Sequence, residues 1–107
     1  MTRFLVLWRR NPVAPWHIDP VERLKLQEMI WAGIDNLLKK GEVKEFGFFS
    51  DGISGYAIGE GDGATVFKDV SMFVPYFESE VHEIIDYEKG KEIVRALMKA
   101  LAEAAKK

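Results

Sequence analysis

Arg10, His17 and two tryptophans, Trp8 and Trp16, form a group of residues whose types suit small-molecule chemistry. A guanidinium such as that of Arg10 can hold a carboxylate through paired hydrogen bonds, and an imidazole such as that of His17 can move a proton near neutral pH. The two indoles would supply aromatic walls. These residue types predict a site for a small anionic or aromatic molecule, with Arg10 as anion anchor and His17 as proton carrier.

The same residues also have a structural interpretation, which we favour. The tryptophans would then pack in the core, and His17 would be an exposed residue of the proline-rich loop that precedes a helix. Arg9 and Arg10 would pair with Glu60 and Asp62, which follow a later strand pattern. On the functional interpretation, Glu60 is instead expected at the mouth of the pocket, among its ligand-binding residues.

The stretch GEGDGA, residues 59–64, matches the short dinucleotide-binding pattern G-x-G-x-x-A. A pyrophosphate site needs bare backbone amides in a favourable field, whereas Glu60 and Asp62 each repel phosphate. The motif also follows the third strand pattern instead of opening a doubly wound sheet. We therefore interpret it as a bend, in which Gly59 allows close packing, the later glycines permit the turn, and Asp62 caps the next helix.

Three further residues have both a structural and a functional interpretation. Tyr56 could line a pocket or pack in a subunit interface, and we favour the interface. Trp31 lies at the rim of a helical apolar face, where it could close a pocket, although a core position is favoured. His82 alternates with acids and is interpreted as solvated. The chain has only two histidines, and they lack the spacing of metal ligands, so we expect no metal and no other cofactor.

Seven elements are expected to position these residues, in the order β-α-β-β-α-β-α. The strand patterns cover residues 3–9, 43–50, 54–60 and 80–87, and the helical patterns cover residues 20–40, 62–74 and 88–106. Asp19 and Pro20 suit the start of the first helix, and Gly41 suits its end. Asp51 and Gly52 predict a two-residue type I′ turn between the second and third strands.

The first six elements match the ferredoxin-like split βαβ arrangement, so the fold class is predicted as α+β with a four-stranded antiparallel sheet and a C-terminal helix. We expect a single domain over residues 1–107, with its core in residues 3–87. We also expect the first and third strands to be central and parallel. Their carboxyl ends would then bring Glu60 and Asp62 to the sheet edge that holds Arg10.

Two helices can cover only one face of such a sheet. The first strand is apolar on both faces, so the opposite face also needs cover. A two-fold dimer through that face is the favoured solution. The alternative is that the C-terminal helix folds over the face within the same chain.

Composition excludes several other classes of protein. The net charge of −2 argues against nucleic-acid binding, and the absence of cysteine excludes disulfides and a thiolate nucleophile. No apolar run approaches the ~20 residues of a membrane span, and no secretory signal is recognised. We expect a cytoplasmic homodimer that binds neither nucleic acid nor membranes.

The element order, the small residues of the third strand and the sequence Phe73-Val74-Pro75-Tyr76 resemble the dimeric α+β barrel superfamily. Within it, the chain is similar to short proteins related to muconolactone isomerase, over residues 3–87. The resemblance implies a back-to-back sheet dimer with a pocket in each subunit between sheet and helices. The superfamily includes isomerases, cofactor-free monooxygenases, haem-degrading enzymes and ligand-sensing domains, so the fold does not settle the function.

The expected function is therefore the binding of a small aromatic or anionic molecule in that pocket. If the protein is an enzyme, we expect a cofactor-independent isomerase-like or monooxygenase-like activity. The alternative is a non-enzymatic interaction or structural dimer module, or a ligand-sensing domain. An open apolar cavity between sheet and helices would favour ligand binding, and a closed, fully packed space would favour the interaction module.

Overall fold

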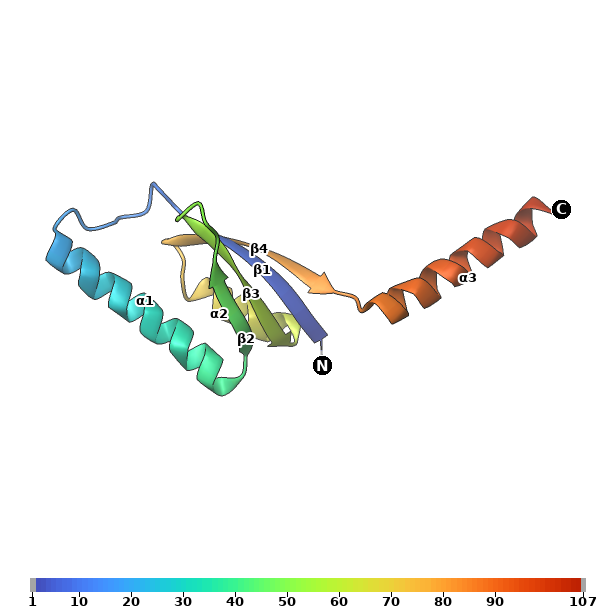
Figure 1. Ribbon diagram of the computed structural model, residues 1–107, viewed down its shortest axis with the longest axis horizontal. Coiled ribbons are helices and arrows are strands. Elements are labelled where there is room, and N and C mark those ends of the chain that lie inside the picture. The colour runs from blue at the N-terminus through green and yellow to red at the C-terminus, as the bar shows by residue number, and fades with distance from the viewer. Residues whose placement is uncertain (1, 107) are drawn as a thin grey trace.

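A computed structural model describes residues 2–106 and shows a four-stranded sheet with three helices (Figure 1). The elements are β1 (Thr2–Arg10), α1 (Pro20–Lys40), β2 (Val43–Phe48), β3 (Ser54–Gly61), α2 (Gly63–Ser71), β4 (Phe77–Ile84) and α3 (Tyr87–Ala105). The strand order is β2-β3-β1-β4, and each neighbouring pair is antiparallel. These features confirm the predicted α+β class and the ferredoxin-like order of elements.

The prediction that the first and third strands are parallel is wrong. β1 and β3 pair in antiparallel fashion, with Arg3 opposite Glu60 and Arg9 opposite Ser54. The physical reason is the β2–β3 hairpin: a right-handed crossover makes β1 parallel to β2, and the hairpin then reverses β3. Glu60 and Asp62 therefore lie at the opposite end of the sheet from Arg9 and Arg10, and the predicted pairing of these acids with these arginines is also wrong.

The loop between β2 and β3 differs from the predicted two-residue turn. Gly52 has a positive φ of 81°, but within residues 2–106 no residue other than glycine has a positive φ, which excludes a type I′ turn at Asp51. Instead, the Asp51 carboxylate accepts hydrogen bonds from the backbone N–H groups of Ile53 at 2.9 Å and Ser54 at 3.0 Å. The turn is thus held by a side chain that replaces a backbone acceptor.

β4 begins and ends about three residues earlier than the sequence pattern predicted, at Phe77–Ile84 instead of 80–87. Phe77 pairs with Arg10 of β1, and its ring packs edge-on against Trp8 with centroids 5.4 Å apart. This aromatic contact extends the strand to residues that precede 80–87, the alternating acidic stretch that predicts it. α2 likewise ends at Ser71, before the predicted stop at Pro75.

Helix caps account for the ends of α1 and the start of α2. Asp19 caps α1 by accepting from the backbone N–H of Val21, and Gly41 ends it with a left-handed φ of 80°. Asp62 caps α2 by accepting from the N–H of Thr65 at 2.8 Å. Gly61, just before this cap, has a φ of 144°. Residues 59–64 therefore form the predicted bend and cap.

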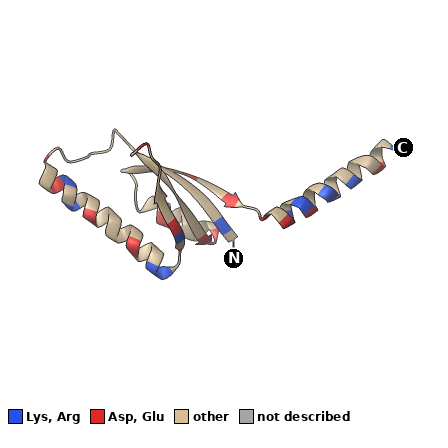
Figure 2. Cartoon of the chain, viewed as in Figure 1, with Lys and Arg blue, Asp and Glu red and all other residues tan. Residues whose placement is uncertain are grey.

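α3 extends away from the rest of the molecule, which is 71 Å long as a result (Figure 1). None of its residues is buried. Basic and acidic residues are interspersed along its length (Figure 2). It does not fold back over the sheet, so the alternative of cover within the same chain is wrong. No helix within residues 2–106 combines the length and the apolarity needed to cross a membrane.

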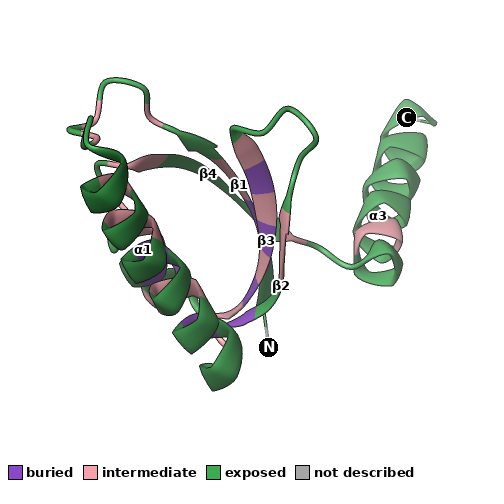
Figure 3. Cartoon of the chain, turned by 60° about the vertical axis from the view of Figure 1, so that its left-hand side comes forward, coloured by how far each residue is buried: buried purple, intermediate pink, exposed green. Residues whose placement is uncertain are grey.

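α1 and α2 lie on one face of the sheet, and the buried residues gather between these helices and the sheet (Figure 3). Alternation along β1 turns Phe4 and Val6 toward the helices, where they are 7% exposed. The core of residues buried together comprises Phe4, Val6, Leu37, Val43, Ala57 and Val66. The opposite face carries Leu5 and Leu7 of β1 beside Tyr56 and Ile58 of β3, all half-buried. We call this second surface the open face.

Candidate ligand-binding cavity

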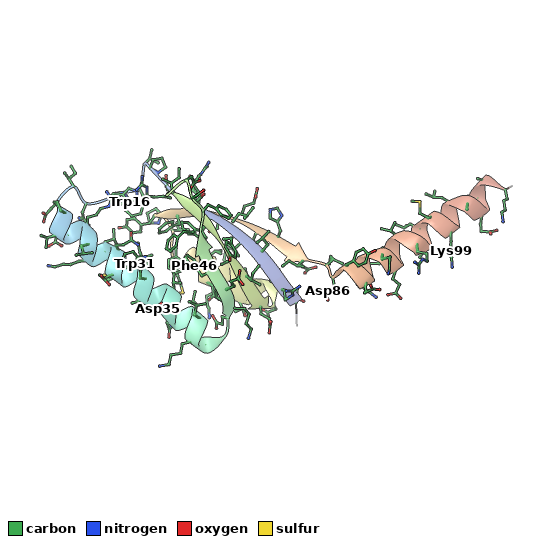
Figure 4. All side chains as sticks on the ribbon, viewed as in Figure 1. Trp16, Trp31, Asp35, Phe46, Asp86 and Lys99 are labelled. Carbon is green, nitrogen blue, oxygen red and sulfur yellow. The ribbon has the colours of Figure 1, made fainter. Side chains whose placement is uncertain are left out.

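A cavity of about 280 Å³ lies between the helix-covered face of the sheet and the two helices. Trp31 of α1 and Phe46 of β2 lie on facing elements and both line it (Figure 4). Most of the lining is aliphatic or aromatic, and the charged groups in it are Arg10, Glu42 and Asp69. A largely apolar wall with a few polar groups is typical of small-molecule sites.

The cavity exists because β3 contributes almost no side-chain volume to this face. Gly55, Ala57 and Gly59 alternate toward the helices and are all buried. At Gly55 the space above the backbone is filled by the Trp8 indole. Ala57 and Gly59 line the cavity together with residues of α1 and α2. The small-residue pattern in the sequence therefore produces a cavity as well as close packing.

Trp8 forms a rigid aromatic wall at one side of the cavity. Its ring stacks on Phe46 with centroids 5.3 Å apart and an interplanar angle of 9°, and Phe48 and Phe77 pack against it edge-on. The indole Nε1 also donates a hydrogen bond to the carbonyl oxygen of Tyr56 at 3.3 Å. These contacts fix the plane of the indole, which favours stacking of a flat ligand.

Two carboxyl groups, Glu42 and Asp69, lie at the other end of the cavity; we call them the carboxyl pair. The Asp69 side chain is only 9% exposed. One oxygen of each group, Oδ1 of Asp69 and Oε2 of Glu42, is buried without a hydrogen-bond partner among the described residues. Lys68 lies nearby, with its Nζ 3.7 Å from Glu42 Oε1 and 3.8 Å from Asp69 Oδ1.

Burial, a hydrogen bond to Glu42 when Asp69 is protonated, and the negative charge of Glu42 together raise the pKa of Asp69 from 3.8 to about 6. Lys68 and Lys40 act against this shift. The pair therefore shares a proton at mildly acidic pH. Such a pair can supply an acid and a base to the same bound molecule.

The sequence reasoning missed the carboxyl pair, although one signal of it was present. Val66, Asp69, Val70 and Phe73 have helical spacing, which places Asp69 within the apolar stripe of α2. A carboxylate at such a position is buried more often than one on the polar face. Glu42, between α1 and β2, carried no comparable signal.

Three of the predicted site residues, Trp8, Arg10 and Trp31, line the cavity. Arg10 lies at the end opposite the carboxyl pair. Gly59, which lines the cavity near the pair, is opposite Phe4, and the β1 segment from Phe4 to Arg10 spans roughly 20 Å. The cavity is therefore polarised, with a cation at one end and two carboxyl groups at the other.

Trp16 and His17 lie outside the cavity lining. The Trp16 Nε1 donates to the carbonyl oxygen of Asn11 at 2.6 Å, and its ring packs against Tyr76 and lies below the guanidinium groups of Arg10 and Arg23. His17 is exposed in the same loop. The structure thus brings Trp16 to Arg10 but does not place His17 with them in a pocket.

Tyr56 and Glu60 also lie away from the cavity, on the opposite side of the sheet. The Tyr56 hydroxyl donates to Glu45, which raises the tyrosine pKa, and its ring crosses the sheet surface above Gly47. Glu60 lies 3.9 Å from Lys44 Nζ. Tyr56 is thus part of the open face, and its place in a subunit interface stays a prediction.

No protein-family model matches the chain, and a search of curated proteins also finds no match. Among residues 2–106, no three His, Asp or Glu side chains gather in a way that could hold a metal ion. His82 instead lies 3.1 Å from Glu80 in an exposed pair.

Proposed function

We propose that the protein is a homodimer that binds a small, largely apolar organic molecule in the cavity between the sheet and the helices. The cavity itself supports this proposal. Its volume of about 280 Å³ is close to the lower limit of ligand pockets, about 300 Å³. An aromatic ring would pack against the cavity wall that includes Trp8 and Trp31, and an anionic substituent would be held at the Arg10 end.

The first prediction tests binding with a variant that fills the cavity. Ile34 of α1 lines the cavity, so Ile34→Trp should occupy the space that a ligand needs. At saturating indole or benzoate, the wild-type melting temperature should rise by about 5 °C, because a ligand that binds only the folded state stabilises it. The variant should show almost none of this rise in a thermal-shift assay.

Met29→Trp is the matched control, because it introduces the same side chain on α1 at a residue that is 72% exposed. This control should respond to the probes as the wild type does. If the wild type shows no stabilisation by either probe, or if Ile34→Trp responds as strongly as Met29→Trp, the cavity is not a binding site.

The dimer is proposed from two apolar surfaces that the chain itself leaves without cover. One is the open face, and the other is a stripe on α3 formed by Val94, Leu97 and Leu101, which are 54%, 57% and 62% exposed. Their spacing is that of the seam between paired helices. An amphipathic helix gains most of its stability from packing of its apolar side, so a second copy is the simplest source of that packing.

The second prediction tests this dimer. Leu97→Glu places a charge in the apolar stripe of α3 and should raise the dimer dissociation constant at least about tenfold. Sedimentation equilibrium measures that constant directly. Lys99 (Figure 4) lies opposite the stripe by helical spacing, and Lys99→Glu introduces the same side chain there. Although it lowers the net charge by two instead of one, it should leave the constant within about twofold of wild type. A monomeric wild type, or equal behaviour of the two variants, would contradict the proposal.

In this proposal the chain is a member of the dimeric α+β barrel superfamily, similar to proteins related to muconolactone isomerase. The ferredoxin-like order of elements and the location of the cavity support that assignment. If the protein is an enzyme, its chemistry would be cofactor-independent and isomerase-like or monooxygenase-like.

The second candidate is an interaction module or a ligand-sensing domain, which the exposed stripe of α3 favours. Failure of the first prediction together with success of the second would favour the interaction module. If both predictions succeed and the dimer dissociation constant changes when ligand is added, ligand sensing is favoured.

A further inference from the structure

The chain exposes more surface than a compact monomer of its mass. Its accessible surface is 7832 Å², whereas a folded monomer of 12.2 kDa exposes about 6,100 Å². The excess of about 1,700 Å² lies within the roughly 1,000–2,500 Å² that each subunit of an obligate dimer buries. Because α3 extends from the body without a buried residue, an excess of this size fits an interface with a second copy.

The α3 stripe and the open face match in length and in chemistry. α3 has 19 residues and is about 28 Å long, and β1, a central strand of the open face, has 9 residues and is about 30 Å long. On that face Leu5 lies opposite Ile58, and Leu7 lies opposite Tyr56. The centre of the face is therefore an apolar strip along which an apolar helix stripe can lie.

Charges at the borders of the two surfaces are complementary. Glu80 of β4 and Glu45 of β2 lie on the open face, each opposite an apolar residue of it. Within the described part of the chain, neither carboxylate pairs with a lysine or an arginine. Glu80 contacts His82, and the hydroxyl of Tyr56 donates to Glu45. Arg95, on a flank of the α3 stripe, likewise takes no part in the ion pairs of α3 among the described residues.

Two other pairings of the same surfaces cover less. Two α3 stripes packed on each other would leave the open face uncovered, and 19 residues fall short of the about 3–4 heptads that are typical of a coiled coil. Two open faces packed back to back, as the family resemblance implies, would leave the α3 stripe uncovered. They would also bring the acids of both copies to one interface, where like charges repel. Packing of α3 on the open face covers both apolar surfaces and brings Arg95 to these acids.

We infer that α3 of each copy packs along the open face of the other copy, in a dimer with two-fold symmetry. This inference rests on the proposed function, since it specifies the contact of the proposed homodimer. Two-fold symmetry makes the two contacts identical, so each copy gives one helix and receives one. The cavity lies on the helix-covered face of the sheet, so it stays outside this interface.

Cysteine cross-linking maps the contact, because the chain has no cysteine of its own. Leu7→Cys on the open face and Leu97→Cys in the α3 stripe are mixed, equilibrated and joined with a short bismaleimide, with a tag on one chain to identify the mixed product. Lys99→Cys replaces Leu97→Cys in the matched control, because Lys99 lies on the other side of the helix by helical spacing. The mixed product of Leu7→Cys and Leu97→Cys should exceed that of the control at least about threefold.

Isotope-filtered NMR tests the same contact in the wild type, and so does not depend on the folding of a cysteine variant. In a dimer formed from ¹³C-labelled and unlabelled chains, NOEs are expected between the methyl groups of Leu97 and Leu7. These NOEs can arise only between copies, since α3 extends away from the body of its own chain (Figure 1).

Each outcome bears on a different statement. If Leu97→Cys cross-links mainly to itself, or Leu7→Cys to itself, the dimer forms through paired helices or back-to-back sheets. The inference is then overturned while the proposed homodimer stands. A wild type that sediments as a dimer without mixed cross-links or NOEs also overturns the inference alone. A wild type that sediments as a monomer overturns both the inference and the proposed homodimer.

Discussion

Gly55→Ala should lower the free energy of unfolding by about 3 kcal/mol or more, measured by urea denaturation. A methyl group at this residue would overlap both the Gly47 carbonyl oxygen and the Trp8 indole. The first belongs to the β2–β3 ladder, so it cannot move without disrupting strand pairing. The second is held by Phe46, Phe48 and Phe77. Neither neighbour can move aside easily, so most of the overlap is expressed as lost stability.

Gly63→Ala is the matched control for this substitution. A methyl group at Gly63 has no neighbour within 4 Å, and the residue opens α2 without a positive φ. It should be neutral or stabilise by a few tenths of a kcal/mol, because alanine restricts the unfolded chain. The double variant Gly55→Ala/Trp8→Leu then separates the two contacts. A double variant more stable than the sum of the single effects would show that the indole contact dominates.

An effect of Gly55→Ala below about 1 kcal/mol would contradict the placement of the indole over β3. Because Trp8 also lines the cavity, the same variant should weaken binding of aromatic probes. Loss of stability and loss of binding are therefore linked at this residue, whereas Ile34→Trp removes binding by occupying the cavity.

Local features of this fold could be predicted from the sequence, because each depends on neighbouring residues. Asp19, Gly41 and Asp62 occupy the helix ends that their types favour. The alternation of Phe4 and Val6 with Leu5 and Leu7 identified a strand with two apolar faces. These features follow from backbone geometry and from hydrogen bonds made within a few residues.

Features that depend on the sense of strand pairing were predicted less well. The prediction that Arg10 and Glu60 meet at one sheet edge requires the first and third strands to be parallel, and the antiparallel register separates the two residues. The grouping of His17 with Arg10 depended on a proline-rich loop, whose path is not determined by periodicity. Trp8 and Trp31 reach the cavity because they lie on regular elements, where side-chain direction follows from the period.

The carboxyl pair could not be recognised from residue types alone. Glu42 and Asp69 are ordinary acids in the sequence, and their properties arise only when α2 packs near the start of β2. Burial and the neighbouring Glu42 then raise the pKa of Asp69. Chemistry of this kind depends on tertiary packing, so the helical spacing of Asp69 with Val66 and Phe73 was its only trace in the sequence.

Asp69→Asn should make the protein progressively more stable than the wild type as the pH rises from about 4 to about 7. In the wild type, burial and Glu42 raise the pKa of Asp69 from 3.8 to about 6. The folded state therefore binds this proton more tightly than the unfolded state does. Stability that depends on protonated Asp69 is fully present below pH 3.8 and is lost as the pH rises through about 6.

The asparagine variant has no proton to lose at this residue, so its stability does not fall for this reason as the pH rises. The difference in unfolding free energy between variant and wild type should grow by at most about 3 kcal/mol across this range, as measured by urea denaturation at several pH values. Glu42→Gln should reduce the pH dependence without abolishing it, because burial of Asp69 remains. Asp35→Asn, at an exposed carboxyl, reports the effect of net charge alone.

If the difference in unfolding free energy for Asp69→Asn stays flat, or shrinks as the pH rises, Asp69 is ionised freely in the folded protein. The pair would then be an ordinary solvated feature of the surface.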